Sequence, residues 1–144
     1  MSIESDNQQP LTTYYQVYYD EKNRVICVDY AAGIILTEAI FSQVLVEIEK
    51  VSQTLPQKVF VIANVNGATV DAGLQRNYEK YYSATLQYTR GILRYNVTNL
   101  LTQVTIRAAT VTNHLQRNQS HIYPNKAAAI EAVRLLEQTE LPPT

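Results

Sequence analysis

The amino-acid sequence predicts an α/β domain whose mixed, largely parallel sheet opens with an antiparallel hairpin. Strand-like and helix-like segments follow one another in the order β-β-α-β-α-β-α-β-α, which is typical of parallel sheets with crossover helices. The chain has 144 residues, of which 46% are hydrophobic and 17% charged, as expected for a globular protein with a core. We therefore expect one domain over residues 13–139, flanked by tails at 1–12 and 140–144.

The hairpin is predicted from two runs of strand-forming residues close together in the sequence. Residues 13–19 are rich in Tyr, Thr and Val, and residues 24–30 form a second such run. The four residues between them, Asp-Glu-Lys-Asn, have the polarity of a turn. Two strands joined by so short a connection pair in antiparallel fashion.

The middle of the chain predicts two helices around a central strand. Thr37 is placed to cap a helix over residues 38–53, whose apolar side chains recur at helical spacing. The apolar run 59–63 predicts a strand that is covered on both faces. A loop over 64–70 follows, and Asp71 is placed to cap a second helix that reaches about residue 88.

The last third predicts two further strand and helix pairs. Residues 92–97 alternate between two unlike faces, as a strand does. Thr98 is placed to cap a third helix, and residues 119–123 read as a short last strand. Asn125 is placed to cap a closing helix to about residue 138. The apolar stripe that we expect the third helix to bury comprises Leu101, Val104, Ala108, Val111 and Leu115.

Composition and charge argue against several classes of function. A formal net charge of -1 gives no basic field that would attract nucleic acid. A single cysteine and two histidines cannot supply a Cys/His zinc site. The first residues resemble no secretion signal and no apolar run is long enough to cross a membrane, so we expect a cytoplasmic protein without an integral membrane segment.

The residue types that usually carry catalysis occur in unpromising places. Cys27 lies inside an apolar strand pattern, which favours a buried structural role. His114 and His121 have no nearby acidic residue to orient them. The strand, loop and helix over 64–74 have the topology of a phosphate-binding loop but lack its consecutive glycines and its lysine. We expect no enzyme activity, no metal site and no cofactor.

Tyrosine usage is the least ordinary feature of the composition. The chain has 11 Tyr against 2 Phe and no Trp, and they concentrate in the first strand and in the second helix. Because a buried phenol hydroxyl must find a hydrogen-bond partner, Tyr suits partly buried positions where the ring is covered and the hydroxyl reaches solvent. Three interpretations stay open: the margin of the core, an aromatic ligand cleft, and the interface of a homodimer. Three arginines lie near these tyrosines in the sequence: Arg76, Arg90 and Arg94. They are either solvated side chains or the cationic edge of a cleft.

Five segments resemble the sulphate transporter and anti-sigma factor antagonist (STAS) superfamily, particularly its lipid-binding-type branch of small bacterial domains. They are YYQVYYDEKNRVICVDY, KVFVIANV, NGATVDAGL, GILRYNV and HIYPNKAAAIEAVRLL, and the resemblance spans about residues 14–138. The resemblance implies a STAS-like fold. It also implies a non-enzymatic regulatory domain that binds a partner protein through the loop and helix after the central strand, or alternatively carries a small apolar or lipid-like ligand in a Tyr-lined cleft.

The resemblance also points to particular residues. Phosphorylated members carry an Asp-Ser-Ser-Gly type sequence at the loop-helix junction, where this chain has Asp71-Ala72-Gly73-Leu74. The acceptor hydroxyl is therefore replaced by Ala72, and we expect no kinase switch there. The candidate residues for binding a ligand or partner are Asn64, Asn66, Gly67, Thr69, Asp71, Tyr78, Tyr81, Tyr82 and Arg94.

Overall fold

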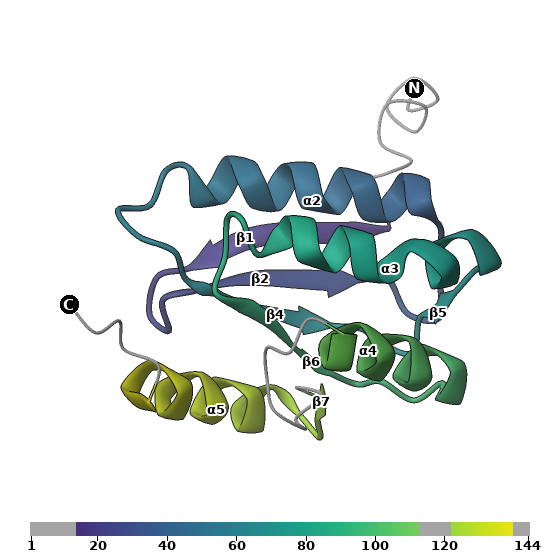
Figure 1. Ribbon diagram of the computed structural model, residues 1–144. Helices are drawn as coiled ribbons and strands as arrows, with labels where there is room; N and C mark the ends of the chain where they lie inside the picture. The colour runs from purple at the N-terminus through teal and green to yellow at the C-terminus, as the bar shows by residue number, and fades with distance from the viewer. Residues whose placement is uncertain (1–13, 113–121, 140–144) are drawn as a thin grey trace, which may run out of the picture.

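The computed structural model describes residues 14–112 and 122–139 and has the predicted mixed α/β architecture (Figure 1). Its main sheet has five strands in the order β1-β2-β4-β6-β7. Strands β2, β4, β6 and β7 run parallel, and β1 is antiparallel to β2 at one edge. The strands are β1 (Tyr15–Asp20), β2 (Val25–Tyr30), β4 (Phe60–Asn64), β6 (Gly91–Tyr95) and β7 (Ile122–Tyr123).

The antiparallel hairpin is confirmed, with Tyr15 opposite Tyr30 and Asp20 opposite Val25. Its turn is held by Asp20, whose side chain accepts hydrogen bonds from the backbone and the side chain of Asn23. Arg24 closes the turn with φ 57, in the left-handed region that non-glycine residues rarely adopt. The chain therefore keeps an arginine where a glycine would meet less strain.

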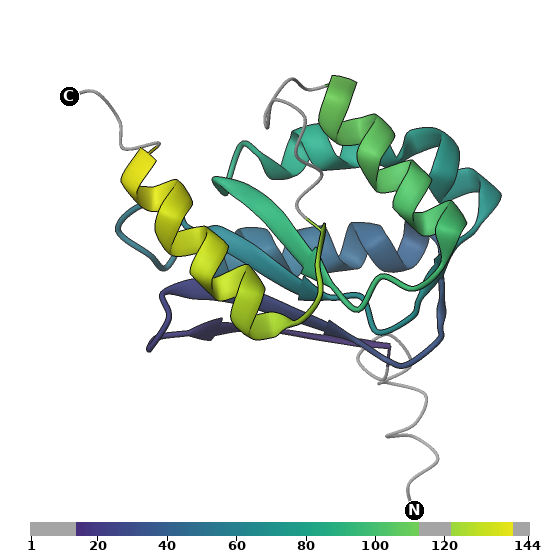
Figure 2. The same cartoon turned by 90° about the horizontal axis from the view of Figure 1, so that it is seen from below.

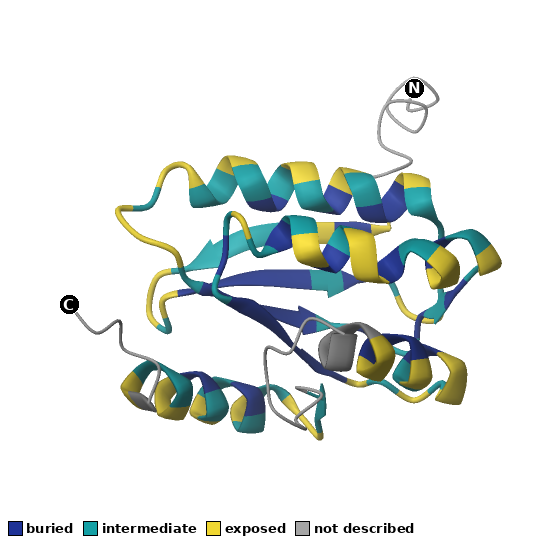
Figure 3. Cartoon of the chain, in the orientation of Figure 1, coloured by how far each residue is buried: buried dark blue, intermediate teal, exposed yellow. Residues whose placement is uncertain are grey.

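The helices of the described part of the chain cover both faces of the sheet (Figures 1 and 2). Helices α2 (Glu38–Ser52), α3 (Ala72–Thr85) and α4 (Leu100–Thr112) contribute to one large apolar cluster. Helix α5 (Lys126–Thr139) covers the opposite face and packs over β4 and β6. Figure 3 shows the inner strands β2, β4 and β6 as mostly buried and the edge strand β1 as mostly intermediate.

The predicted helix caps are confirmed at three positions and wrong at one. The side chains of Thr37, Asp71 and Asn125 accept hydrogen bonds from backbone N–H groups three residues on, at 3.2, 2.8 and 2.9 Å. At α4 the cap is Asn99, whose side chain accepts from the backbone N–H of Thr102 at 3.1 Å. Thr98 is not the cap because α4 begins one residue later than predicted.

The predicted inward stripe of α4 is also wrong wherever its side chains are described. Leu101, Val104 and Ala108 are exposed, whereas Thr102, Thr105 and Ile106 are buried. The threonines can be buried because their hydroxyls are satisfied: Thr102 donates to the Ala68 carbonyl at 3.1 Å and Thr105 to the Leu101 carbonyl at 2.9 Å. Among its described side chains, α4 therefore exposes Leu101 and Val104 and buries two threonines.

The sequence did not predict a second, two-stranded sheet. Strand β3 (Ile35–Leu36) pairs in parallel with β5 (Thr69–Val70), inside segments that were expected to be loops. Two-residue strands are too short to show the alternation from which strands are predicted. This small sheet fixes the chain on both sides of the loop that follows β4.

Some predictions lie outside the described residues. They are the tails, His114, Leu115, His121 and the first part of the strand expected over 119–123. Within the described ranges 14–112 and 122–139, no helix is both long enough and apolar enough to cross a bilayer.

Candidate functional site

The loop after β4 is built around left-handed backbone positions. Asn66 has φ 54 and Gly67 has φ 73, so the chain reverses sharply at the carboxyl end of the strand. The Asn66 side chain donates to the Tyr30 carbonyl at 3.0 Å, which ties the loop to β2. Asn64 accepts a 2.8 Å hydrogen bond from the side chain of Asn96, at the end of β6. These bonds make the loop a defined surface at the carboxyl ends of three adjacent parallel strands.

The second half of the loop is held by β3 and by the start of α3. The backbone N–H groups of Thr69 and Asp71 donate to the carbonyls of Ile34 and Leu36, each at 3.0 Å. The Asp71 carboxylate caps α3, so it is engaged by the helix N-terminus. Thr69 is half-buried within β5.

Arg94, on β6, is buried beneath α3. Its side chain is 2% exposed. The Nε and Nη2 atoms donate to the Tyr78 hydroxyl at 3.1 and 2.8 Å, and Nη1 donates to the Ile92 carbonyl at 3.1 Å. No carboxylate pairs with it within the described part of the chain. Arg94 is therefore neither solvated nor at the edge of an open cleft, and neither prediction from the sequence holds.

Aromatic rings surround the buried guanidinium. The rings of Tyr78 and Tyr82 are nearly parallel, with centroids 6.4 Å apart. The guanidinium carbon of Arg94 lies 5.8 Å from the Tyr78 centroid and 5.1 Å from that of Tyr82, within the range of cation–π attraction. The Tyr82 hydroxyl is buried without a hydrogen-bond partner among the described residues. Burial raises the pKa of Tyr82, and the charge of Arg94 opposes that rise.

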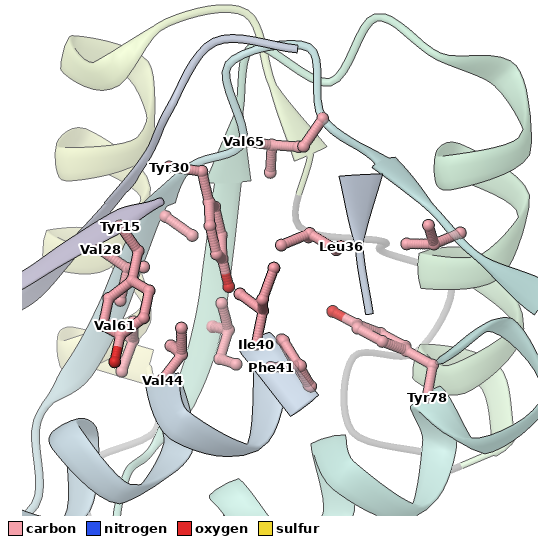
Figure 4. Close-up of a cluster of buried hydrophobic side chains, with 14 of the residues drawn as sticks. Tyr15, Val28, Tyr30, Leu36, Ile40, Phe41, Val44, Val61, Val65 and Tyr78 are labelled. Carbon is pink, nitrogen blue, oxygen red and sulfur yellow. The ribbon is translucent and has the colours of Figure 1, made fainter. Parts of the chain in front are cut away.

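A small cavity lies beside this cluster, among the core side chains that Figure 4 shows. Tyr30 from β2 and Tyr78 from α3 point into that core from opposite sides. The cavity volume is about 30 Å³. Since one water needs roughly 10–15 Å³ on this measure, the space suits about two waters and is far too small for an acyl chain.

Tyr81 has a different environment from the other tyrosines of α3. It is half-buried, and its hydroxyl donates to Glu38 at 2.7 Å across the contact between α2 and α3. The same carboxylate oxygen accepts from Asn77 at 3.2 Å. The sequence did not predict this contact of Glu38, because a partner 43 residues away leaves no pattern in the sequence.

The candidate residues thus form two groups that the structure does not join. The loop group lies at the surface beyond β4 and comprises Asn64, Asn66, Gly67, Thr69 and Asp71. Tyr78, Tyr82 and Arg94 meet in the core, and Tyr81 lies apart between two helices. The structure therefore contains no Tyr-lined cleft formed by Tyr78, Tyr81 and Tyr82.

The outer side of α3 and α4 forms a surface groove that the sequence did not predict. The groove has a volume of about 220 Å³, and Tyr78 lies in its wall with its other side toward Arg94. Beside it, Leu100, Leu101 and Val104 of α4 are 71%, 44% and 52% exposed. The groove is lined by Gln75, Arg76, Tyr78, Glu79, Val104, Thr105 and Ala108.

The described residues offer no assembled catalytic or metal-binding group. Cys27 is 2% exposed in β2, and burial raises the pKa of its thiol. Within residues 14–112 and 122–139, no three His, Cys, Asp or Glu side chains come together as metal ligands.

Comparison with known proteins supports the fold. No protein-family model and no curated protein matches the chain. Among solved structures it is similar to the murine solute carrier 26 family member A9 anion transporter, with 17% identity and a TM-score of 0.57. That match covers 77% of this chain and 18% of the transporter chain. A second match is the anti-sigma factor antagonist SpoIIAA in its unphosphorylated form, with 13% identity, a TM-score of 0.45, and 83% and 97% of the two chains covered.

The match to the transporter, together with the observed strand order, confirms the STAS-like fold. At 17% identity the likeness concerns the fold. The chain spans less than a fifth of the transporter that it matches, as the 18% coverage states.

We predict that the cost of removing the Tyr78 hydroxyl depends on Arg94. Tyr78→Phe leaves two donor atoms of a buried cation without an acceptor, so it should lower the free energy of unfolding by about 1–3 kcal/mol. In an Arg94→Met background, which removes the charge and keeps an apolar stem, the same change should cost much less. Urea denaturation of the four proteins measures this coupling. An equal cost in both backgrounds would contradict the assigned role of the guanidinium.

Proposed function

We propose that residues 13–139 form a non-catalytic STAS-like interaction domain of the cytoplasm. It binds a partner protein over the outer face of α4, the groove between α3 and α4, and the adjoining loop of residues 64–71. The loop packs against α4, because the buried Thr102 hydroxyl of α4 donates to the Ala68 carbonyl of the loop. The STAS-like fold supports the regulatory or interaction class of function. The identity of the partner is a separate matter.

The inverted orientation of α4 is the observation that carries this proposal. A surface helix normally buries its apolar stripe and exposes its polar one. Helix α4 buries Thr102 and Thr105 together with Ile106, and it exposes Leu100, Leu101 and Val104. Exposed apolar side chains grouped beside a groove are typical of a protein-binding surface. Figure 3 shows the exposed positions along the outer side of α4.

The charges around the groove indicate the chemistry of the partner. Arg76 and Glu79 of α3 line the groove. Arg107 of α4 is exposed and follows Val104 by three residues, which places the two on neighbouring positions of the helix surface. An amphipathic helix would place apolar side chains against Val104 and in the groove, as in other helix-in-groove complexes. Acidic residues flanking that apolar stripe would complement the two arginines.

Carriage of a small apolar or lipid-like ligand is the second candidate function, as in the lipid-binding branch of the superfamily. The support for it is weaker, because the interior cavity of about 30 Å³ holds about two waters. A lipid-like ligand would therefore occupy the outer groove of about 220 Å³ instead. A kinase-driven switch at the start of α3 is not part of the proposal, since Ala72 has no hydroxyl.

We also propose that the chain forms a homodimer through β1. This strand is at the edge of the main sheet and pairs only with β2 among the described strands. Tyr14 is exposed, and Tyr18 and Tyr19 are half-buried along it. An edge strand with unpaired backbone groups is a template for pairing with a second copy. The Ala31 N–H donates to the Tyr14 carbonyl, so the hydrogen-bonded pairs of the hairpin alternate from there and the N–H of Val17 points away from β2. Sedimentation equilibrium should show a dimer that Val17→Pro weakens, and a monomer at every concentration would exclude it.

The partner proposal is tested by a photo-crosslinking amino acid at position 104. In the native host it should capture a protein that the same amino acid at position 46 does not. Val46 is the matched control because it is also an exposed valine, 42% exposed, but on α2. The captured protein should then bind the purified chain, and Val104→Lys should weaken binding at least tenfold by burying a charge against an apolar surface.

A matched variant on α2 controls for the added charge. Val46→Lys adds the same charge to an exposed helix and should leave the calorimetrically measured affinity unchanged. Circular dichroism checks that both variants remain folded. Equal binding by Val104→Lys and the wild-type chain, or adducts at position 46 alone, would remove the outer face of α4 from the interface.

A further inference from the structure

Three adjacent parallel strands each begin beside a basic residue. Arg24 directly precedes β2, Lys58 lies two residues before β4, and Arg90 directly precedes β6. These residues are far apart in the sequence, but β2, β4 and β6 are neighbours in the sheet. Because neighbouring strands are about 4.8 Å apart, the three strand starts lie within roughly 10 Å. The topology thus gathers three cations at the amino ends of the strands.

These cations line one surface pocket with a volume of about 300 Å³. It lies at the end of the sheet opposite the 64–71 loop, where the β1–β2 turn, the α2–β4 connection and the end of α5 come together (Figures 1 and 2). That volume is at the lower end of the range for small-molecule sites. The pocket is lined by Tyr19, Arg24, Leu55, Pro56, Gln57, Lys58, Val59, Arg90 and Glu137.

Two of the three cations, Arg90 and Lys58, are positioned by contacts with the rest of the chain. The Arg90 guanidinium lies over the Phe60 ring at 4.9 Å, and its backbone N–H donates to the Val59 carbonyl at 2.9 Å. The Lys58 ammonium donates to the Leu86 carbonyl at 3.4 Å. Arg24 makes no side-chain hydrogen bond or ion pair to any part of the chain that the structure describes. Its donors are available to a ligand.

The backbone of Arg24 is independent evidence that its side chain matters. At φ 57 the residue is in the left-handed region, where hairpin turns usually have glycine or asparagine because these residues adopt it with less strain. No requirement of the turn selects arginine at this position. Strained backbone positions occupied by a chemically active side chain concentrate at functional sites.

We infer that this pocket binds a small soluble phosphate monoester. Three cations and the single carboxylate of Glu137 leave a formal charge of about +2, which matches the charge of nearly -2 on a phosphate monoester at pH 7. Arginine side chains hydrogen-bond phosphate oxygens in a bidentate manner. Tyr19, Leu55 and Pro56 give the pocket an apolar side, which accommodates the organic part of the ester.

Isothermal titration calorimetry with phenyl phosphate, inorganic phosphate and phenol tests this site. Phenyl phosphate should bind one to one and more tightly than inorganic phosphate, because the ring contacts the apolar side. Phenol, which lacks the charge, should show no saturable binding. Arg24→Gly should weaken phenyl phosphate binding about tenfold or more, as expected for the loss of a charge-assisted hydrogen bond. Its thermal unfolding midpoint should stay the same or rise, because glycine relieves the left-handed backbone.

A matched pair of lysine variants controls for net charge. Lys58→Gln should weaken binding, whereas Lys50→Gln removes the same charge from the exposed face of α2 and should leave the affinity unchanged. Absence of saturable binding of both phosphate compounds at millimolar concentrations would overturn the inference, as would equal affinities for the wild-type chain and Arg24→Gly. The protein should also be mixed with phosphatidate vesicles and sedimented. If it sediments with them and phenyl phosphate does not release it, the three cations bind a lipid surface, and the inference of a soluble ligand is overturned.

Discussion

The contact between the Arg94 guanidinium and the Tyr78 hydroxyl is the constraint on which the candidate surface depends. A buried cation without a carboxylate is costly unless its donors are satisfied, and Tyr78 accepts from two of its nitrogen atoms. This requirement keeps α3 over β6, so the wall of the groove between α3 and α4 has a fixed position. Tyr78 faces both the guanidinium and the groove, and it therefore links the interior of the molecule to the proposed partner surface.

The two ends of the sheet carry different chemistry as a consequence of the topology. At the carboxyl ends of β4 and β6, asparagine side chains and left-handed backbone positions form a neutral polar surface beside the apolar face of α4. At the amino ends, basic residues from separate connections converge on one pocket. A parallel sheet makes both arrangements possible, because all equivalent strand ends lie on the same side. A partner protein and a small phosphate ester would therefore bind to the domain without competing for the same residues.

Local patterns in the sequence predicted most of the fold, and long-range contacts account for what was missed. Thr37, Asp71 and Asn125 were found as caps because capping depends on residues three positions apart. The burial of Arg94 was not predicted because its hydrogen-bond partner, the Tyr78 hydroxyl, lies 16 residues away on α3. The buried face of α4 was misassigned because apolar spacing does not reveal that Thr102 finds a carbonyl 34 residues away. The candidate loop residues were located from the sequence, but the groove and the cationic pocket depend on how elements pack.

The orientation of α4 underlies the proposed function and is measured most directly by the reactivity of introduced cysteines. Val104→Cys and Thr105→Cys place a thiol on neighbouring residues, of which Val104 is 52% and Thr105 6% exposed. The native Cys27 is 2% exposed and is the only cysteine, so it contributes little background. With a water-soluble thiol reagent, the thiol at position 104 should react almost as fast as in the unfolded chain and the thiol at 105 far more slowly. Faster modification at position 105 than at 104 would show that α4 buries its apolar face, and the account would be wrong.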